Sequence, residues 1–205
     1  MLTLVDKQHA LPLAYVPLDL VPIPEEYVSS LDRQQLRQAA KEALVRMLNV
    51  ALQEGLTIKV NSAYRSAQYQ LAVFRTEVAA VGCTQALRES AVPGHSEHQL
   101  GLAADLTTAS VGWGLEDAFG QTVEGRWLAE HAAGYGFVLS YPEGKETVTG
   151  YQFEPWHYRY VTEPLAAAIV RSRKTPAEYL GSLGSVSSTP LSSSTPEAVA
   201  ATACA

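Results

Sequence analysis

Two side chains that could bind a metal ion lie seven residues apart near the middle of the sequence, His98 and Asp105. A neutral imidazole and a carboxylate are both good ligands for Zn²⁺, which accepts nitrogen and oxygen donors. Gly101, between them, would let the backbone turn tightly so that both side chains face one point. Because a catalytic zinc ion usually has three protein ligands and one open position, this pair is only half of a site.

The segment Glu154-Pro-Trp-His157 offers the other half. Proline pushes the residue before it out of the helical region, so we expect His157 at the start of a strand and not on a helix. Glu154 would lie beside the metal ion but outside its coordination shell. A carboxylate there can act as a general base that takes the proton of the attacking water. Trp156 alternates with His157 and should face the core or form a pocket wall.

Hydrophobic periodicity predicts the elements that would position these residues. A helix is predicted from Ser29 or Ser30 to Glu54, and a second from Ser66 to about Ala80. Further helices and strands are predicted by the same patterns: helices at 124–133 and 164–173, and strands at 57–60, 102–107, 137–141 and 156–161. Residues 84–101 are predicted as loop, and a polar turn over 142–150 indicates a hairpin to residues 151–153. The proline-rich residues 1–28 should form an extended strap over the core.

Composition limits the class of protein. The chain has 205 residues, 47% hydrophobic and 18% charged, which suits one folded domain with a sizeable core. Its net charge of −6 argues against broad nucleic-acid binding, which needs basic patches. No apolar run approaches the roughly 18 residues of a membrane span, and no signal peptide is visible. Cys83 and Cys204 lie far apart and are expected to form no disulfide framework and to indicate no compartment.

The composition changes at about Leu183, where Ser, Thr, Pro and Ala begin to dominate. Such a segment cannot bury enough apolar surface to fold. We therefore predict one domain over residues 1–182, which includes the N-terminal strap, and a disordered tail over residues 183–205.

Four motifs, taken in order, resemble those of the LAS metallopeptidases, and in particular their VanY-type D-alanyl-D-alanine carboxypeptidase branch. They are Ser62-Ala-Tyr-Arg-Ser66, Pro93-Gly-His-Ser-Glu-His-Gln-Leu-Gly-Leu-Ala-Ala-Asp105, Gly136-Phe-Val-Leu-Ser-Tyr-Pro142 and Gly150-Tyr-Gln-Phe-Glu-Pro-Trp-His157 with its continuation to Val161. The similarity spans roughly residues 10–175. It implies an α+β fold, a single domain in which helices pack on a small antiparallel sheet that carries zinc, as in D,D-peptidases and Hedgehog-like proteins.

The resemblance also implies a role for individual residues. Three of them match the zinc ligands: His98, Asp105 and His157. Glu154 matches the general base, and Arg65 matches the arginine that steadies the polarised carbonyl or the substrate carboxylate. Four residues would form the substrate pocket: Gln70, Ser96, Tyr141 and Trp156.

Neighbouring positions carry further expectations. Ser140 stands where many relatives have a basic residue, which leaves the preferred substrate side chain open, and Thr162 replaces a common glycine. Glu97 is expected to be solvated, and Arg159 to brace its strand. His95 is expected to shape its loop by hydrogen bonding and not to be a fourth ligand.

The implied activity is that of a zinc-dependent D,D-carboxypeptidase, which removes the terminal D-alanine from peptidoglycan stem peptides by attack of a metal-activated water. The partner would be a peptide or precursor that ends in D-Ala-D-Ala, and the protein would be a monomer. A D,D-dipeptidase, an L,D-carboxypeptidase and a phage-type endopeptidase are alternatives on the same machinery. A Hedgehog-like zinc module that only binds a partner is the alternative from another class, and the intact Glu154 argues against it. The resemblance implies a location in the cell envelope, while the lack of a visible signal peptide leaves the cytoplasm open.

Overall fold

The computed structural model describes residues 2–30, 34–184 and 204, and a four-stranded antiparallel sheet lies at the centre of this part of the chain. The strands follow the order β3 (Lys59–Ser62), β4 (Ala103–Thr107), β6 (His157–Tyr160) and β5 (Phe137–Leu139). Every residue of the two central strands, β4 and β6, is buried. All four predicted strands are confirmed, with ends displaced by no more than two residues.

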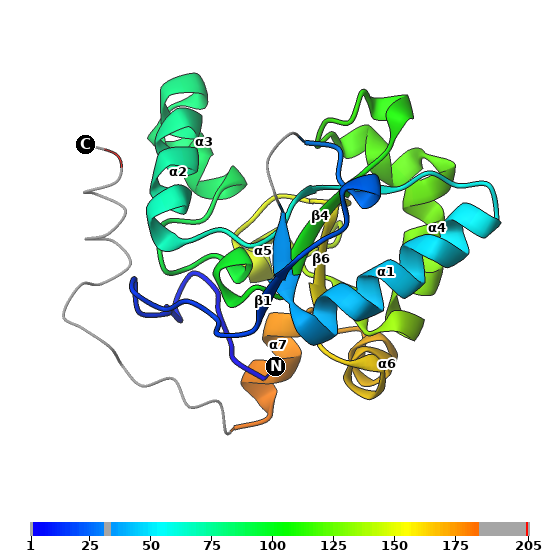
Figure 1. The fold of residues 1–205 in the computed structure, drawn as a ribbon. Helices are drawn as coiled ribbons and strands as arrows, with labels where there is room; N and C mark the ends of the chain where they lie inside the picture. Colours follow the sequence, from blue (N-terminus) through cyan, green and yellow to red (C-terminus); the bar gives the residue numbers. More distant parts are fainter. Residues whose placement is uncertain (1, 31–33, 185–203, 205) are drawn as a thin grey trace.

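Helices cover this sheet, and Figure 1 shows α1 and α4 to one side of it and the α2–α3 pair to the other. The apolar stripe of α1 (Gln38–Gln53) is buried in the main core, where Leu44 and Met47 are fully inaccessible. The remaining helices are α2 (Ala67–Val81), α3 (Cys83–Glu89), α4 (Val123–His131), α5 (Glu146–Thr149), α6 (Glu163–Ser172) and α7 (Pro176–Ser182). Short 3₁₀ turns connect them at η1 (Glu25–Tyr27), η2 (Glu97–Leu100), η3 (Ala109–Val111), η4 (Asp117–Gln121) and η5 (Ala132–Tyr135). The α+β class is therefore confirmed.

The N-terminal segment is the predicted strap. It runs mostly without regular structure and buries Leu4, Val5, Leu11 and Ile23. Its one strand, β1 (Leu20–Pro22), pairs with β2 (Gln35–Arg37) in a separate two-stranded sheet. The predicted start of the first helix at Ser29 or Ser30 is wrong, because this pairing holds residues 35–37 extended and α1 begins only at Gln38.

Two other local expectations are wrong. The predicted loop over 84–101 contains α3, which packs against α2. The predicted hairpin from the 142–150 turn to residues 151–153 does not form, because β5 pairs with β6 instead. Packing against the preceding helix decides the local structure in the first case, and pairing with β6 decides it in the second. The helix predicted to begin at Ser66 is confirmed, and Ser66 caps α2 through a 3.1 Å bond from the Tyr69 N–H.

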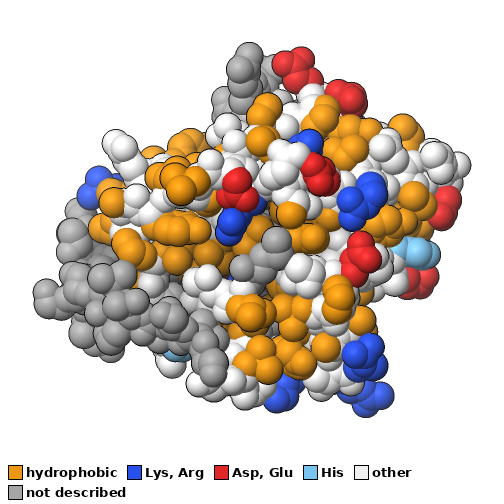
Figure 2. Space-filling view, turned by 60° about the horizontal axis from the view of Figure 1, so that its bottom comes forward, with side chains coloured by type: hydrophobic (Ala, Val, Ile, Leu, Met, Phe, Trp, Pro, Cys, Tyr) orange, Lys and Arg blue, Asp and Glu red, His pale blue; other side chains and the backbone are white. Residues whose placement is uncertain are grey.

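On the face shown in Figure 2 the described basic and acidic side chains are scattered among one another, with no continuous basic surface. No helix in the described ranges is both long and apolar enough to cross a membrane.

The predicted disordered tail lies almost wholly outside the described residues, which resume only at Cys204, so its disorder stays a prediction.

Cys204 changes one expectation directly, because it forms a disulfide with Cys83 at the start of α3. The two Cα atoms are 5.7 Å apart although 121 residues separate them in sequence. The expectation that the two cysteines form no framework is wrong. A single pair at such a separation carries no readable spacing, so only the tertiary structure could show it.

Loss of this disulfide should destabilise the protein, because the bond closes a long loop and so restricts the unfolded chain. Cys204→Ser should lower the free energy of unfolding by about 2–4 kcal/mol, measured by denaturant unfolding without reductant. Cys83→Ser should have the same effect, and the double variant no larger one. Single variants as stable as the parent would show that the bond does not form in solution.

Thr162, which replaces a common glycine, adopts a backbone conformation that glycine favours. It joins β6 to α6 with φ +94° and ψ 152°, a region in which a side chain with a branched Cβ is strained. Gly136 packs closely against this turn, since a Cβ on it would lie 2.9 Å from the Thr162 carbonyl carbon. The strain is therefore held in place by the surrounding fold.

Thr162→Gly should relieve this strain and stabilise the protein by about 1 kcal/mol, net of the greater freedom of glycine in the unfolded chain. For a domain of this size that corresponds to a rise of about 2–4 °C in melting temperature, measurable by calorimetry. Thr162→Ala is the matched control, because it keeps the Cβ and should gain much less. A glycine variant that melts at or below the parent temperature would contradict the interpretation.

Candidate metal centre and active site

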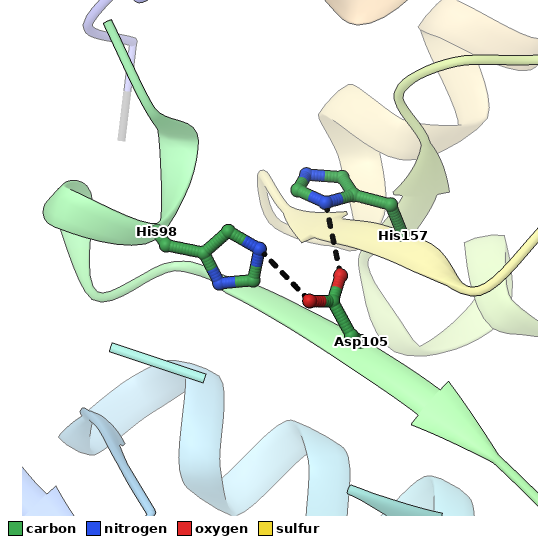
Figure 3. Close-up of side chains that lie close together, drawn as sticks. All are labelled: His98, Asp105 and His157. Atoms are coloured by element: carbon green, nitrogen blue, oxygen red, sulfur yellow. Dashed lines mark hydrogen bonds and ion pairs between the residues drawn. The ribbon is translucent and has the colours of Figure 1, made fainter. Parts of the chain in front are cut away.

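Three side chains with metal-ligand atoms converge beside the central strands (Figure 3). Asp105 in β4 lies directly opposite His157 in β6, so the two side chains project from the same face of the sheet. His98 comes from η2, the turn that leads into β4. Asp105 Oδ2 lies 3.2 Å from His98 Nε2, and Oδ1 lies 3.1 Å from His157 Nδ1. The three residues predicted to bind metal are therefore together and buried.

Gly101 makes the turn between η2 and β4, as the sequence predicts. Its φ is +67°, in the left-handed region. A Cβ at this position would lie 2.8 Å from the Leu20 side chain and 3.0 Å from that of Arg37. Only glycine fits both the conformation and the space, and this turn brings His98 back toward Asp105.

His98 is in the state that a metal ligand requires. Its Nδ1–H donates to the Ala63 carbonyl oxygen at 2.6 Å, which leaves the Nε2 lone pair directed at the site. Nε2 is buried and has no hydrogen-bond partner among the described residues. Burial, followed by the charge of Arg65, lowers the pKa of His98 to about 4, so the ring is neutral. The spacing of ligand atoms also suits an ion, since two ligands on tetrahedral zinc lie about 3.3 Å apart.

Glu97 hydrogen-bonds to the second histidine, His157, through the ring nitrogen that does not face Asp105. It accepts hydrogen bonds from His157 Nε2 at 3.0 Å, from Ser140 Oγ at 2.6 Å and from Arg159 Nη1 at 2.7 Å. Burial alone would raise the pKa of Glu97, but Arg159 and these hydrogen bonds together lower it to about 2. The ionised carboxylate thus holds the Nε2 proton of His157 and leaves Nδ1 facing Asp105.

The expectation that Glu97 is solvated is wrong, since only 3% of it is exposed. Sequence reasoning missed it because its partners lie 43 to 62 residues further along the chain. The available signal was Arg159 itself, a charged residue in a predicted strand, because an arginine that is buried there needs an acidic partner. Ser140, one of the two departures from the family pattern, is buried against Glu97.

Glu154 lies next to the three candidate ligands and lines the same cavity. Its Oε2 is 3.7 Å from His157 Nδ1, and its N–H donates to the Tyr141 carbonyl oxygen at 3.0 Å. Burial raises the pKa of Glu154 to about 8, an effect that His157 opposes. A dication at the site would favour the ionised form further. Glu154 lies just before β6, and a carboxylate in this place can accept a proton beside a bound metal ion.

Arg65 occupies the connection between β3 and α2. Its Nη2 lies 3.6 Å from Asp105 Oδ2, and its side chain is 17% exposed. It lines the cavity that contains the three ligands and Glu154. A guanidinium in this place can bind an oxyanion or a carboxylate in the cavity.

Three of the four predicted substrate-pocket residues line this cavity, which has a volume of about 280 Å³: Ser96, Tyr141 and Trp156. The Tyr141 ring lies 4.8 Å from that of His157, and Ser96 Oγ accepts from the His98 N–H at 3.3 Å. Gln70 is not among the lining residues. Its Nε2 donates to the Ala91 carbonyl oxygen at 2.8 Å and so supports one wall of the cavity, while its contact with substrate stays a prediction.

The sheet, the helices around it and a buried His-Asp-His cluster with an adjacent glutamate define a zinc peptidase fold of the LAS type. The family model of VanY, D-alanyl-D-alanine carboxypeptidase, matches residues 33–163. The chain therefore belongs to the VanY family.

Known proteins of this kind resemble the chain over most of its length. YodJ of Bacillus subtilis (strain 168) is 41% identical over 181 residues, which cover 87% of this chain and 66% of YodJ. The structure of the LD-carboxypeptidase LdcB is 41% identical, with a TM-score of 0.80 over 87% of this chain and 84% of LdcB. A D,D-pentapeptidase VanY in complex with Zn(II) is 30% identical, with a TM-score of 0.71 over 87% of this chain and 98% of that one. The chain thus spans slightly less than two thirds of its curated relative YodJ.

Glu97→Gln should weaken zinc binding about 10- to 100-fold, because the amide cannot fix the same His157 tautomer with a full negative charge. Competition with a chromophoric chelator would measure the dissociation constant. His98→Ala should abolish tight binding, since two ligands rarely hold the ion. Glu178→Gln, at a partly exposed ion pair with Lys145, is the control and should bind like the parent. Unchanged zinc affinity in Glu97→Gln would contradict the assigned role.

Proposed function

We propose that this protein is a zinc-dependent D-alanyl-D-alanine carboxypeptidase that removes the terminal D-alanine from peptidoglycan stem peptides. The observation that carries the proposal is the position of Glu154, a buried carboxylate that shares one cavity with the three ligand side chains and Arg65. A site that only binds metal needs no such base. The family match and the VanY structure with Zn(II) support the same activity.

His98, Asp105 and His157 would hold the zinc ion through Nε2, a carboxylate oxygen and Nδ1. Bound there, zinc supplies Lewis acidity to the scissile carbonyl and lowers the pKa of water. Asp105 is held in the ionised form that a ligand needs. Burial opposes its ionisation, but the two histidines lower its pKa well below the usual range.

Glu154 moves the proton. Its carboxylate accepts a proton from the water that attacks the carbonyl carbon of the penultimate residue. When the carbon–nitrogen bond breaks, Glu154 delivers this proton to the departing amine of D-alanine, and the carboxylate is regenerated. A general base of this kind contributes about 10²- to 10⁴-fold to the rate.

Arg65 stabilises negative charge on the substrate. Its guanidinium can donate two parallel hydrogen bonds to the oxyanion or to the terminal carboxylate. Removal of one such donor in comparable sites costs about 3–4 kcal/mol of transition-state stabilisation. Tyr141 and Trp156 would form the walls that orient the peptide, and Ser96 would hydrogen-bond to it.

A second cavity of about 610 Å³ continues from the first past Arg65. The two share four lining residues: Arg65, Val73, Asp105 and Leu115. Its further lining is largely neutral and polar, with Asn61, Ser62 and two tyrosines, Tyr64 and Tyr69. The room beyond the metal centre supports a peptide substrate longer than a dipeptide.

L,D-carboxypeptidase activity is the second candidate, favoured by the similarity to LdcB. The two activities differ in the configuration of the residue that donates the scissile carbonyl, and the same base and ligands would serve both. A Hedgehog-like binding module is disfavoured, because the buried Glu154 would then have no chemical role.

We also propose that the protein acts outside the cytoplasm, in the cell envelope. The family acts on the cell wall. The disulfide between Cys83 and Cys204 supports this location, because disulfides persist in oxidising compartments and are rare in the cytosol.

The activity is tested by incubating the zinc-loaded protein with a muropeptide mixture and identifying the products by mass spectrometry. We expect loss of one D-alanine from pentapeptides. Glu154→Gln should keep its zinc but lose at least about a hundredfold in turnover, because it cannot accept the proton.

Glu130→Gln, an exposed glutamate on α4, is the matched control and should retain the parental rate. Loss of D-alanine only from tetrapeptides would establish the L,D-specific alternative. A Glu154→Gln variant that turns over within a few-fold of the parent would remove the base from the mechanism.

A further inference from the structure

The N-terminal strap contacts the supports of the active site at three points. The Thr3 carbonyl oxygen accepts from Arg159 Nη2 at 2.5 Å, and the Asp6 carbonyl oxygen lies 2.8 Å from His95 Nδ1. The Lys7 ammonium donates to the Leu87 carbonyl oxygen at 2.5 Å, at the end of α3. The VanY family match begins only at residue 33, so none of these strap residues belongs to it.

Lys7 is a strap side chain that contacts Tyr151, one of the residues that line the catalytic cavity. Its Nζ lies 3.7 Å from the centre of the Tyr151 ring, in a cation–π contact. Gly150, with φ +74°, leaves the space that the Lys7 stem fills, because a Cβ there would lie 2.6 Å from Lys7 Cδ. The fold therefore contains a fitted seat for this lysine.

Two tilted aromatic contacts lead from Lys7 to a candidate metal ligand. The Tyr151 ring lies 4.8 Å from the Tyr141 ring, which lies 4.8 Å from the ring of His157. Both tyrosines line the catalytic cavity together with Glu154. Lys7 thus contacts the outer ring, Tyr151, of a pair whose inner ring, Tyr141, contacts His157.

The strap also closes the rear of the site. A cavity of about 410 Å³ lies between strap residues 4–9 and the back of the active site, where Glu97, Ser140 and Tyr141 form its wall. Burial lowers the pKa of Lys7 to about 8, an effect that the charge of Glu154 opposes. Strap and catalytic residues are therefore coupled by packing and by charge.

We propose that Lys7 is a positioning residue for the active site: its ammonium, held by the Leu87 carbonyl, fixes the Tyr151 and Tyr141 rings, which form part of the cavity wall beside His157 and Glu154. The inference rests on the proposed carboxypeptidase activity for its kinetic consequence. Its structural consequence, the placement of the Tyr141 ring against His157, does not depend on that activity.

The test compares three variants with the parent, each checked for melting temperature and zinc content. Lys7→Met keeps most of the stem and removes the charge, and Lys7→Arg restores a cation. Lys59→Met is the matched control, because Lys59 also lies over an aromatic ring, that of Trp113 at 5.5 Å, but outside the catalytic cavity. Turnover and Michaelis constant on a pentapeptide are measured for each, and NMR follows the imidazole signals of His157.

Lys7→Met should bind zinc, lower turnover about 3- to 30-fold with a smaller change in Michaelis constant, and shift the His157 signals. Lys7→Arg should recover most of the turnover, and Lys59→Met should match the parent. Parental kinetics and unshifted signals in Lys7→Met would overturn the proposal, even if that variant melts at a lower temperature. Equal impairment in Lys7→Arg and Lys7→Met would overturn the role of the charge. If the parent cleaves no peptide, the proposed function fails, while the His157 signals still decide the role of Lys7.

Discussion

Two buried carboxylates, Asp105 and Glu97, lie on either side of one imidazole, and the rest of the site depends on how their charge is balanced. A carboxylate removed from water is costly unless opposite charge and hydrogen-bond donors replace its hydration. Glu97 obtains both from Arg159 and Ser140. Asp105 faces His98 and His157, with Arg65 at 3.6 Å. A dication at this point supplies the charge that the neutral His98 cannot, which is the physical reason that the cluster suits zinc.

The segments that carry the ligands also brace one another. Glu97, the neighbour of His98 in η2, supports His157, which lies in β6. Arg159, two residues after His157 on the same strand, supports Glu97 in return. Because strand residues two apart point to the same side, one strand can present both a ligand and the partner of its support. Hydrogen bonds therefore link η2 and β6 at two points, so displacement of either segment disturbs both histidines.

The support of this unit extends beyond the family match. Residues 33–163 contain the candidate ligands, the proposed base and Arg65, yet Arg159 and His95 are held by carbonyl groups of Thr3 and Asp6. These contacts use backbone oxygens, so they place little demand on the side chains of the strap. A segment can then be structurally required while its sequence varies, and its role is visible only in the folded protein.

The sequence by itself determined the parts of this protein that depend on near neighbours. Strand periodicity, the Ser66 cap, the Gly101 turn and the effect of Pro155 on Glu154 act over a few residues, and each is present as predicted. The ligand set could also be inferred, because His98, Asp105, His157 and Glu154 combine residue types that few other roles explain together.

Only the tertiary structure decided the pairings between distant residues. The burial of Glu97, the pairing of β5 with β6, the Cys83–Cys204 disulfide and the seat of Lys7 each join segments that lie far apart in the chain or compete with a local alternative. Such contacts depend on which surfaces meet once the core has closed. No local pattern specifies that choice, because the same residue types occur equally well in solvent.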